Sequence, residues 1–148
     1  MSYLLVTALT ALVAQSKPAL PAELQPLKRS LEQQGFQVKL AIPPVRGAYG
    51  VFRSSDKTIW IAPVTIPLGI VRQTFLHEAA HAVQSCPTGV LSPIGWDIQV
   101  EPAIEREITA ILLSRYKHAN RALEREAFFL QGRPDAVALL MAELKKRC

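Results

Sequence analysis

The chain has 148 residues, a hydrophobic content of 49% and a formal net charge of +5, with a pI near 9.5. This length predicts a single domain over residues 1–148 with enough apolar side chains to fill a core. The basic residues are spread along the chain instead of gathering in one cluster, so the composition does not favour a nucleic-acid-binding protein.

The N-terminal segment over residues 3–14 is strongly apolar and is followed by Pro18 and Pro21. It is too short to span a bilayer, and it lacks the basic residues that begin a secretory signal. We therefore expect an N-terminal apolar helix over residues 1–17 that packs on the core, in a cytoplasmic protein that does not span a membrane. A weak signal or a membrane-surface anchor remains the alternative for this segment.

The next part of the chain predicts a helix and three strands. Leucines at helical spacing after Pro21 indicate a helix that ends near Gly35. Residues 36–42 alternate between apolar and polar side chains, as a half-buried strand does. Residues 48–52 and 58–62 flank a turn-forming segment, which is typical of a β-hairpin.

A buried helix is predicted over residues 68–85, and it contains the sequence His77-Glu78-Ala79-Ala80-His81. Helical residues four apart lie on one face, so both histidines can bind one metal ion. Glu78 then lies beside them to act on a metal-activated water, as in zinc hydrolases. The alternative is a pair of core histidines satisfied by neighbouring groups, with Glu78 exposed. The metal interpretation is favoured because each polar group left unpaired would cost about 1–3 kcal/mol.

Three further helices are predicted after a loop that contains Pro87 and Trp96. The first begins at Pro102, and the others cover about 120–130 and 134–146. The apolar stripe of the first comprises Ile104, Ile108, Ile111 and Leu112. The order of elements predicts an α+β fold, in which a small, mainly antiparallel or mixed sheet packs against the motif helix and a helical C-terminal half follows.

A catalytic zinc ion takes three protein ligands, so one ligand is still needed. The candidates that follow the motif are Asp97, Glu101, Glu105, Glu107, His118, Glu124 and Glu126. Glu124 and Glu126 are favoured because they lie inside an otherwise apolar helix, where buried carboxylates need partners. The alternative is an ordinary helix whose acidic residues form ion pairs with Arg121 and Arg125.

The pattern His77-Glu78-x-x-His81, followed by Glu124-x-Glu126-Ala127, resembles the zincin metallopeptidases, in their glutamate-ligand (gluzincin-like) branch. In several such families the first Glu of a Glu-x-x-Ala segment is the third zinc ligand. The resemblance therefore implies Glu124 as that ligand, with Glu126 as the alternative. Many members have Asn or Asp directly after this Ala, where the present chain has Phe128. The whole chain is also similar to small predicted zincins of cyanobacteria.

A zinc-dependent peptidase is the function that this resemblance implies, with Glu78 as general base and a peptide or protein as substrate. In such folds a strand edge before the motif helix often holds the substrate as an added strand, and residues 58–62 are the expected edge. Tyr116, His118 and Arg121 are candidate oxyanion donors from their position alone. The alternative function is a non-catalytic zincin scaffold that binds a protein or nucleic-acid partner.

The two cysteines, Cys86 and Cys148, allow three interpretations. The expected cytoplasmic location favours reduced thiols. A disulfide that ties the C-terminus to the motif helix is the first alternative. The second is a closed structural zinc site in which thiols join His77 and His81.

Overall fold

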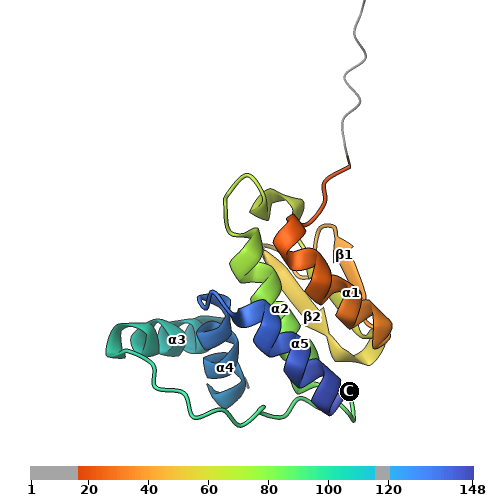
Figure 1. Cartoon of the computed structure of the whole chain (residues 1–148). Helices are drawn as coiled ribbons and strands as arrows, with labels where there is room; N and C mark the ends of the chain where they lie inside the picture. The colour runs from red at the N-terminus through yellow and green to blue at the C-terminus, as the bar shows by residue number, and fades with distance from the viewer. Residues whose placement is uncertain (1–16, 116–120) are drawn as a thin grey trace, which may run out of the picture.

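The computed structural model describes residues 17–115 and 121–148, without the side chains of 111–115. The fold is α+β, as predicted, with a small sheet and helices packed on it (Figure 1). The expected N-terminal helix falls almost wholly on residues 1–16 and lies outside the described residues. The helices are α1 (Gln25–Gln33), α2 (Val71–Gln84), α3 (Pro102–Arg115), α4 (Arg121–Gln131) and α5 (Ala136–Arg147), and the strands are β1 (Gln37–Leu40), β2 (Gly50–Arg53) and β3 (Thr58–Ile61).

The sheet is mixed, with strand order β1-β3-β2. The predicted hairpin is confirmed, because β2 and β3 pair antiparallel with Val51 opposite Trp60. Strand β1 pairs parallel with β3, so β3 is the central strand and every residue of it is buried. The expectation that residues 58–62 form an exposed edge is therefore wrong. The run Thr-Ile-Trp-Ile lacks polar alternation, which is typical of a strand covered on both faces.

One face of the sheet carries the core. Helices α1 and α2 pack on this face, α5 packs against both of them, and α4 packs against α2 (Figure 1). Fully buried side chains from all these elements fill the space between them: Leu24, Leu27, Leu31, Ile59, Ile61, Phe75, Leu76, Leu130, Leu140 and Leu144. On the opposite face Trp60 lies beneath two cations, with Arg53 at 4.5 Å and Lys39 at 5.5 Å from its ring.

Helix α2 is the central helix of the fold. It packs against β2, β3, α4 and α5, and small residues such as Ala79 and Ala80 are fully buried along it. Helix α4 runs antiparallel to it, since Arg72 at the start of α2 donates to the carbonyl of Gln131 at the end of α4 and to that of Arg133 just beyond it. The start of each helix therefore lies beside the end of the other.

Over its described side chains, helix α3 is less buried than the other helices. Ile108 of its predicted apolar stripe is buried, whereas Ile104 is exposed, and the side chains of Ile111 and Leu112 lie outside the described part. Among the residues that the structure describes, no helix is both long and apolar enough to cross a bilayer.

A disulfide joins Cys86 to Cys148, so the expectation of reduced thiols is wrong. The expectation of reduced thiols rested on the cellular compartment alone and did not consider whether the two cysteines are close in the fold. The packing of α5 on α2 places their Cα atoms 5.2 Å apart. Arg147 adds hydrogen bonds to the carbonyls of Cys86 and Ser92. A zinc site made of thiols is excluded as well, because the two sulfur atoms are bonded to each other.

The disulfide is expected to stabilise the metal-free fold. Replacing both cysteines by serine should lower the free energy of unfolding by about 2–4 kcal/mol, because the bond closes a long loop in the unfolded chain. Urea denaturation in the presence of a chelator measures this, with the reduced wild type as the matched control. Equal unfolding midpoints for the oxidised wild type and the double variant would contradict the prediction.

Candidate metal centre

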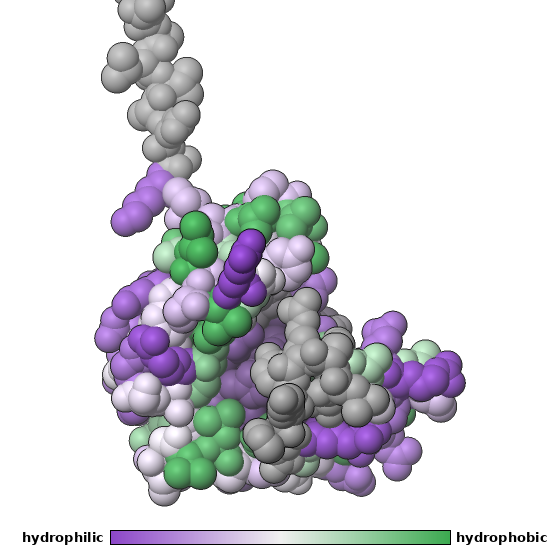
Figure 2. Space-filling model, turned by 180° about the vertical axis from the view of Figure 1, so that it is seen from behind, coloured by the Kyte–Doolittle hydropathy of each residue, from purple (hydrophilic) through white to green (hydrophobic). Residues whose placement is uncertain are grey.

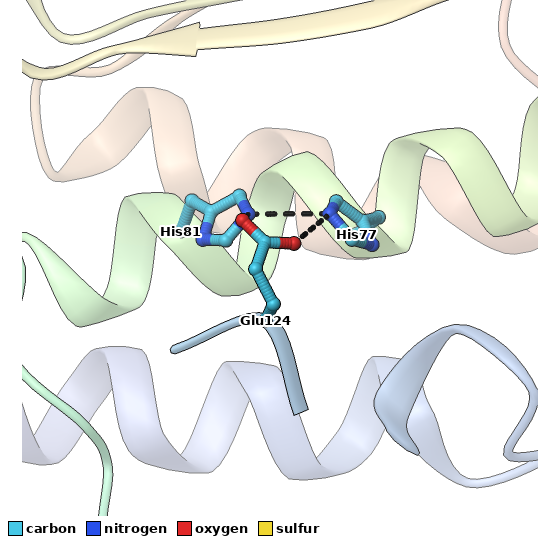
Figure 3. A group of neighbouring side chains, drawn as sticks. All are labelled: His77, His81 and Glu124. Atoms are coloured by element: carbon cyan, nitrogen blue, oxygen red, sulfur yellow. Dashed lines mark hydrogen bonds and ion pairs between the residues drawn. The ribbon is translucent and has the colours of Figure 1, made fainter. Parts of the chain in front are cut away.

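Three potential metal ligands meet between α2 and α4. His77 and His81 project from one face of α2, one turn apart, and Glu124 reaches them from the first turn of α4 (Figure 3). The carboxylate of Glu124 lies 3.1 Å from Nε2 of His77 and 3.3 Å from Nε2 of His81. The two Nε2 atoms are 3.2 Å apart. The structure thus brings together both histidines of the motif and one of the two favoured glutamates.

The spacing of these atoms fits a tetrahedral metal ion. Ligand atoms about 2.0–2.1 Å from such an ion lie about 3.3 Å from one another. The two Nε2 atoms are 3.2 Å apart, and each lies near a different oxygen of Glu124, His77 at 3.1 Å from Oε2 and His81 at 3.3 Å from Oε1, all close to that value. His81 and Glu124 are buried and His77 is half-buried. The group can hold a metal ion with little movement of its side chains.

The far side of each imidazole is hydrogen-bonded to a glutamine oxygen. Nδ1 of His77 lies 3.1 Å from Oε1 of Gln131, and Nδ1 of His81 lies 2.8 Å from Oε1 of Gln84. An amide oxygen only accepts, so each Nδ1 must carry the proton. When a metal ion binds, each Nε2 can therefore turn its lone pair to the ion, whereas in the metal-free protein a proton on Nε2 is shared with Glu124.

The electrostatics of this centre favour a positive charge among the three side chains. Burial opposes ionisation of Glu124 most strongly, but hydrogen bonds from His77 and His81 outweigh it and lower the pKa of Glu124 to about 2. Burial also opposes charge on His81, yet the neighbouring Glu124 and Glu78 raise its pKa above 6.5. In the metal-free protein a proton is therefore drawn to the place where a metal ion would bind.

Glu78 lies between α2 and β2, beside the three ligands. An ideal Cβ at Gly50 would come within 2.8 Å of Cγ of Glu78, so the close contact needs glycine at that position. Burial raises the pKa of Glu78, and the charge of Glu124 adds to this. The charges of His77 and His81 and the backbone N–H of Phe52 act in the opposite direction. The alternative in which Glu78 is an exposed surface residue is not what the structure shows.

Glu126 does not approach the histidines. Its buried carboxylate accepts hydrogen bonds from the backbone N–H groups of Ile94 and Gly95, each 2.8 Å away, and from the side-chain amide of Gln84, also 2.8 Å away. The amide nitrogen of Gln84 donates to the carbonyl of Leu123 as well. These two acceptors orient the Gln84 amide, so that its oxygen faces His81. Glu126 is thus linked to the centre through Gln84.

The remaining candidates lie elsewhere. Asp97, Glu101 and Glu107 are exposed, and His118 and Tyr116 are outside the described residues. Glu105 forms ion pairs with Arg121 and Arg125. The two arginines therefore pair with α3 and not with Glu124 or Glu126, so the interpretation of α4 as an ordinary ion-paired helix is wrong.

Sequence reasoning missed Gln84, Gln131 and the contact made by Phe128. Gln84 is a fully buried polar residue three positions after His81, and its place in an apolar run was the available signal. Phe128 packs edge-on against His77, with ring centroids 4.9 Å apart. The hydrogen bond to Nδ1 of His77 comes from Gln131, one turn of α4 beyond Phe128.

Comparison with protein-family models, with curated proteins and with solved structures finds no match to this chain.

Glu126→Gln is expected to weaken zinc binding about 10–100-fold, although residue 126 does not reach the metal position. The new NH₂ group would face the N–H donors of Ile94, Gly95 or Gln84. The Gln84 amide would then lose its orientation, and its oxygen would no longer hold the proton on Nδ1 of His81. A zinc competition titration measures the affinity, and nitrogen NMR of the imidazoles reports the tautomer. Glu32→Gln, on the exposed face of α1, is the matched control. Unchanged affinity and tautomer in the Glu126 variant would disprove the link.

Zinc affinity should fall as the pH falls through the raised pKa of His81. Below that pKa a proton occupies the imidazole and must be displaced, which weakens binding by about tenfold per pH unit for one proton. Above it the affinity should level off, since Glu124 with a pKa of about 2 stays ionised. Titrations against a chromophoric chelator at several pH values test this. A constant affinity across the neutral range would contradict it.

Proposed function

We propose that this protein is a zinc-dependent peptidase. The observation that carries the proposal is the convergence of His77, His81 and Glu124 at metal-ligand spacing, with the Glu78 carboxylate held beside them. Two imidazoles and one carboxylate form a donor set of catalytic zinc, which leaves one position open. A zinc ion bound there would supply a Lewis acid and an activated water.

Glu78 is the proposed general base. The base of a hydrolase needs a pKa closer to neutrality than that of a free carboxyl, and burial raises the pKa of Glu78 in this direction. The contact with Gly50 and the N–H of Phe52 restrain its side chain against β2. From this position Glu78 would take a proton from the attacking water and pass it to the leaving amine. In this role the residue moves protons and need not bind the metal.

Strand β2 is the proposed binding edge for a peptide substrate, in place of residues 58–62. The N–H of Ala62 donates to the carbonyl of Tyr49 at 2.8 Å, and opposite pairs in an antiparallel ladder are hydrogen-bonded alternately. The main-chain groups of Gly50 and Phe52 therefore point away from β3, toward the side on which no further strand of the described residues pairs. The N–H of Phe52 meets Glu78 on that side. An extended peptide added there would run beside the general base, which is the reason to propose a peptide or protein as substrate.

Metal analysis of the purified protein tests the first half of the proposal. The wild type is expected to hold one zinc ion per chain after dialysis, and His77→Ala and Glu124→Ala should lose it. Glu78→Gln should keep it, because Glu78 is no ligand. Circular dichroism of every variant separates loss of the ligand from loss of the fold. A wild type that retains no zinc after zinc has been supplied would overturn the peptidase proposal.

Cleavage of a peptide library tests the second half. The wild type with zinc should cleave peptides, and Glu78→Gln should be slower by about 10²–10⁴-fold, the usual contribution of a general base. Mass spectrometry of the products gives the positions of cleavage. If the zinc-loaded wild type cuts no peptide, the non-catalytic scaffold becomes the better description.

A further inference from the structure

Large apolar side chains are exposed at one end of the sheet. Five of them lie in two loops, residues 41–49 and 62–70, and they expose between 49% and 86% of their surface: Ile42, Val45, Tyr49, Val64 and Leu68. Single exposed apolar residues are normal, but a group of this kind marks an interaction surface. We call these two loops the apolar end.

The topology of the sheet brings the two loops together. Loop 41–49 connects β1 to β2, the two edge strands, so it must pass over the end of the central strand β3. Loop 62–70 begins at that same end. Two backbone hydrogen bonds join the loops to β3 and to each other, from Ala41 to the carbonyl of Ile61 and from Ala62 to the carbonyl of Tyr49.

The chain also enters the domain at the apolar end. Helix α1 packs on β1 and turns directly into it at Gly35, so the two run in opposite directions. The start of α1 and residues 17–20 therefore lie beside the two loops, as Figure 1 shows. Figure 2 shows apolar side chains gathered near the point where the grey N-terminal segment joins the domain. The sequence that precedes this point, residues 3–14, is itself apolar.

The two loops carry positive charge, and Glu23 near the start of α1 is paired with Arg72. Loops 41–49 and 62–70 contain no acidic residue, and their one charged residue is Arg46, which is exposed. Lys17, where the chain joins the domain, is exposed as well. Apolar side chains that insert among lipid tails, accompanied by cations that meet anionic headgroups, are the features of a membrane-surface contact.

We propose that the apolar end docks on the surface of an anionic membrane. A bilayer can accept the exposed apolar side chains of both loops without a partner of matching shape. The pocket of about 530 Å³ between loop 93–98 and α4 lies away from this end, so the apolar residues do not line that cavity. The docking proposal does not depend on the proposed peptidase activity.

The test is flotation of the full chain with lipid vesicles. Vesicles of phosphatidylcholine are compared with vesicles that also contain phosphatidylserine, and the wild type should bind the second kind more tightly. The double variant Ile42→Asp/Leu68→Asp should bind at least about tenfold more weakly, because apolar contact drives insertion. Arg46→Glu should weaken binding only to the anionic vesicles. These side chains are exposed, so the fold should be unaffected.

A matched control uses exposed apolar residues from other parts of the surface. Val90 is 72% exposed beyond the far end of α2, and Ile104 is 43% exposed on α3. Val90→Asp/Ile104→Asp should bind vesicles as the wild type does, and equal weakening of both double variants would overturn the proposal. So would full binding by the Ile42/Leu68 variant together with loss in Leu9→Asp, since the N-terminal segment alone would then be responsible. Absence of vesicle binding with concentration-dependent dimers in light scattering would instead assign the face to a second copy of the chain.

Discussion

The antiparallel packing of α4 on α2 forces two imidazole lone pairs and a carboxylate into one small buried space. Such a group repels itself unless a cation lies among its atoms, and the raised pKa of His81 reports this demand for positive charge. The surrounding residues hold the three side chains in this arrangement and do not neutralise the repulsion between them. Gln84 and Gln131 hold the protons on the outer nitrogens of the two rings, which leaves the inner nitrogens free to bind.

This arrangement depends on contacts that run through the whole domain. Glu126 ties the orientation of Gln84 to the loop at Ile94 and Gly95, so a chain of hydrogen bonds leads from that loop to His81. On the other side of α2, the absence of a side chain at Gly50 lets β2 approach Glu78. A single helix thus presents ligands to α4 and the proposed base to the sheet. Its small buried residues, among them Ala79 and Ala80, allow both approaches.

Local pattern was enough for much of the fold and for the residues of the centre. The motif helix, the hairpin, the α+β class and the choice of α4 as the source of a third carboxylate all followed from spacing and from polar residues in apolar runs. The failures concern contacts distant in sequence. The parallel pairing of β1 with β3, the bond between Cys86 and Cys148, and the partners of Arg121 and Arg125 leave no local periodic signal. Local pattern left the choice between Glu124 and Glu126 open, because both side chains are buried. The resemblance favoured Glu124, and the structure brings Glu124 to the two histidines.

The disulfide would hold the protein together after a single cut in the backbone between its two cysteines. Cys86 follows the motif helix directly and Cys148 ends the sequence, so α3, α4 and α5 all lie inside one covalent ring. A single break in the backbone between residues 87 and 147 would open the ring without separating the pieces. Proteolytic nicking of the segment around residue 99, for example, would yield two chains that migrate together until a reductant is added. His77 and Glu124 would then belong to different polypeptides, still joined through the sulfur bridge.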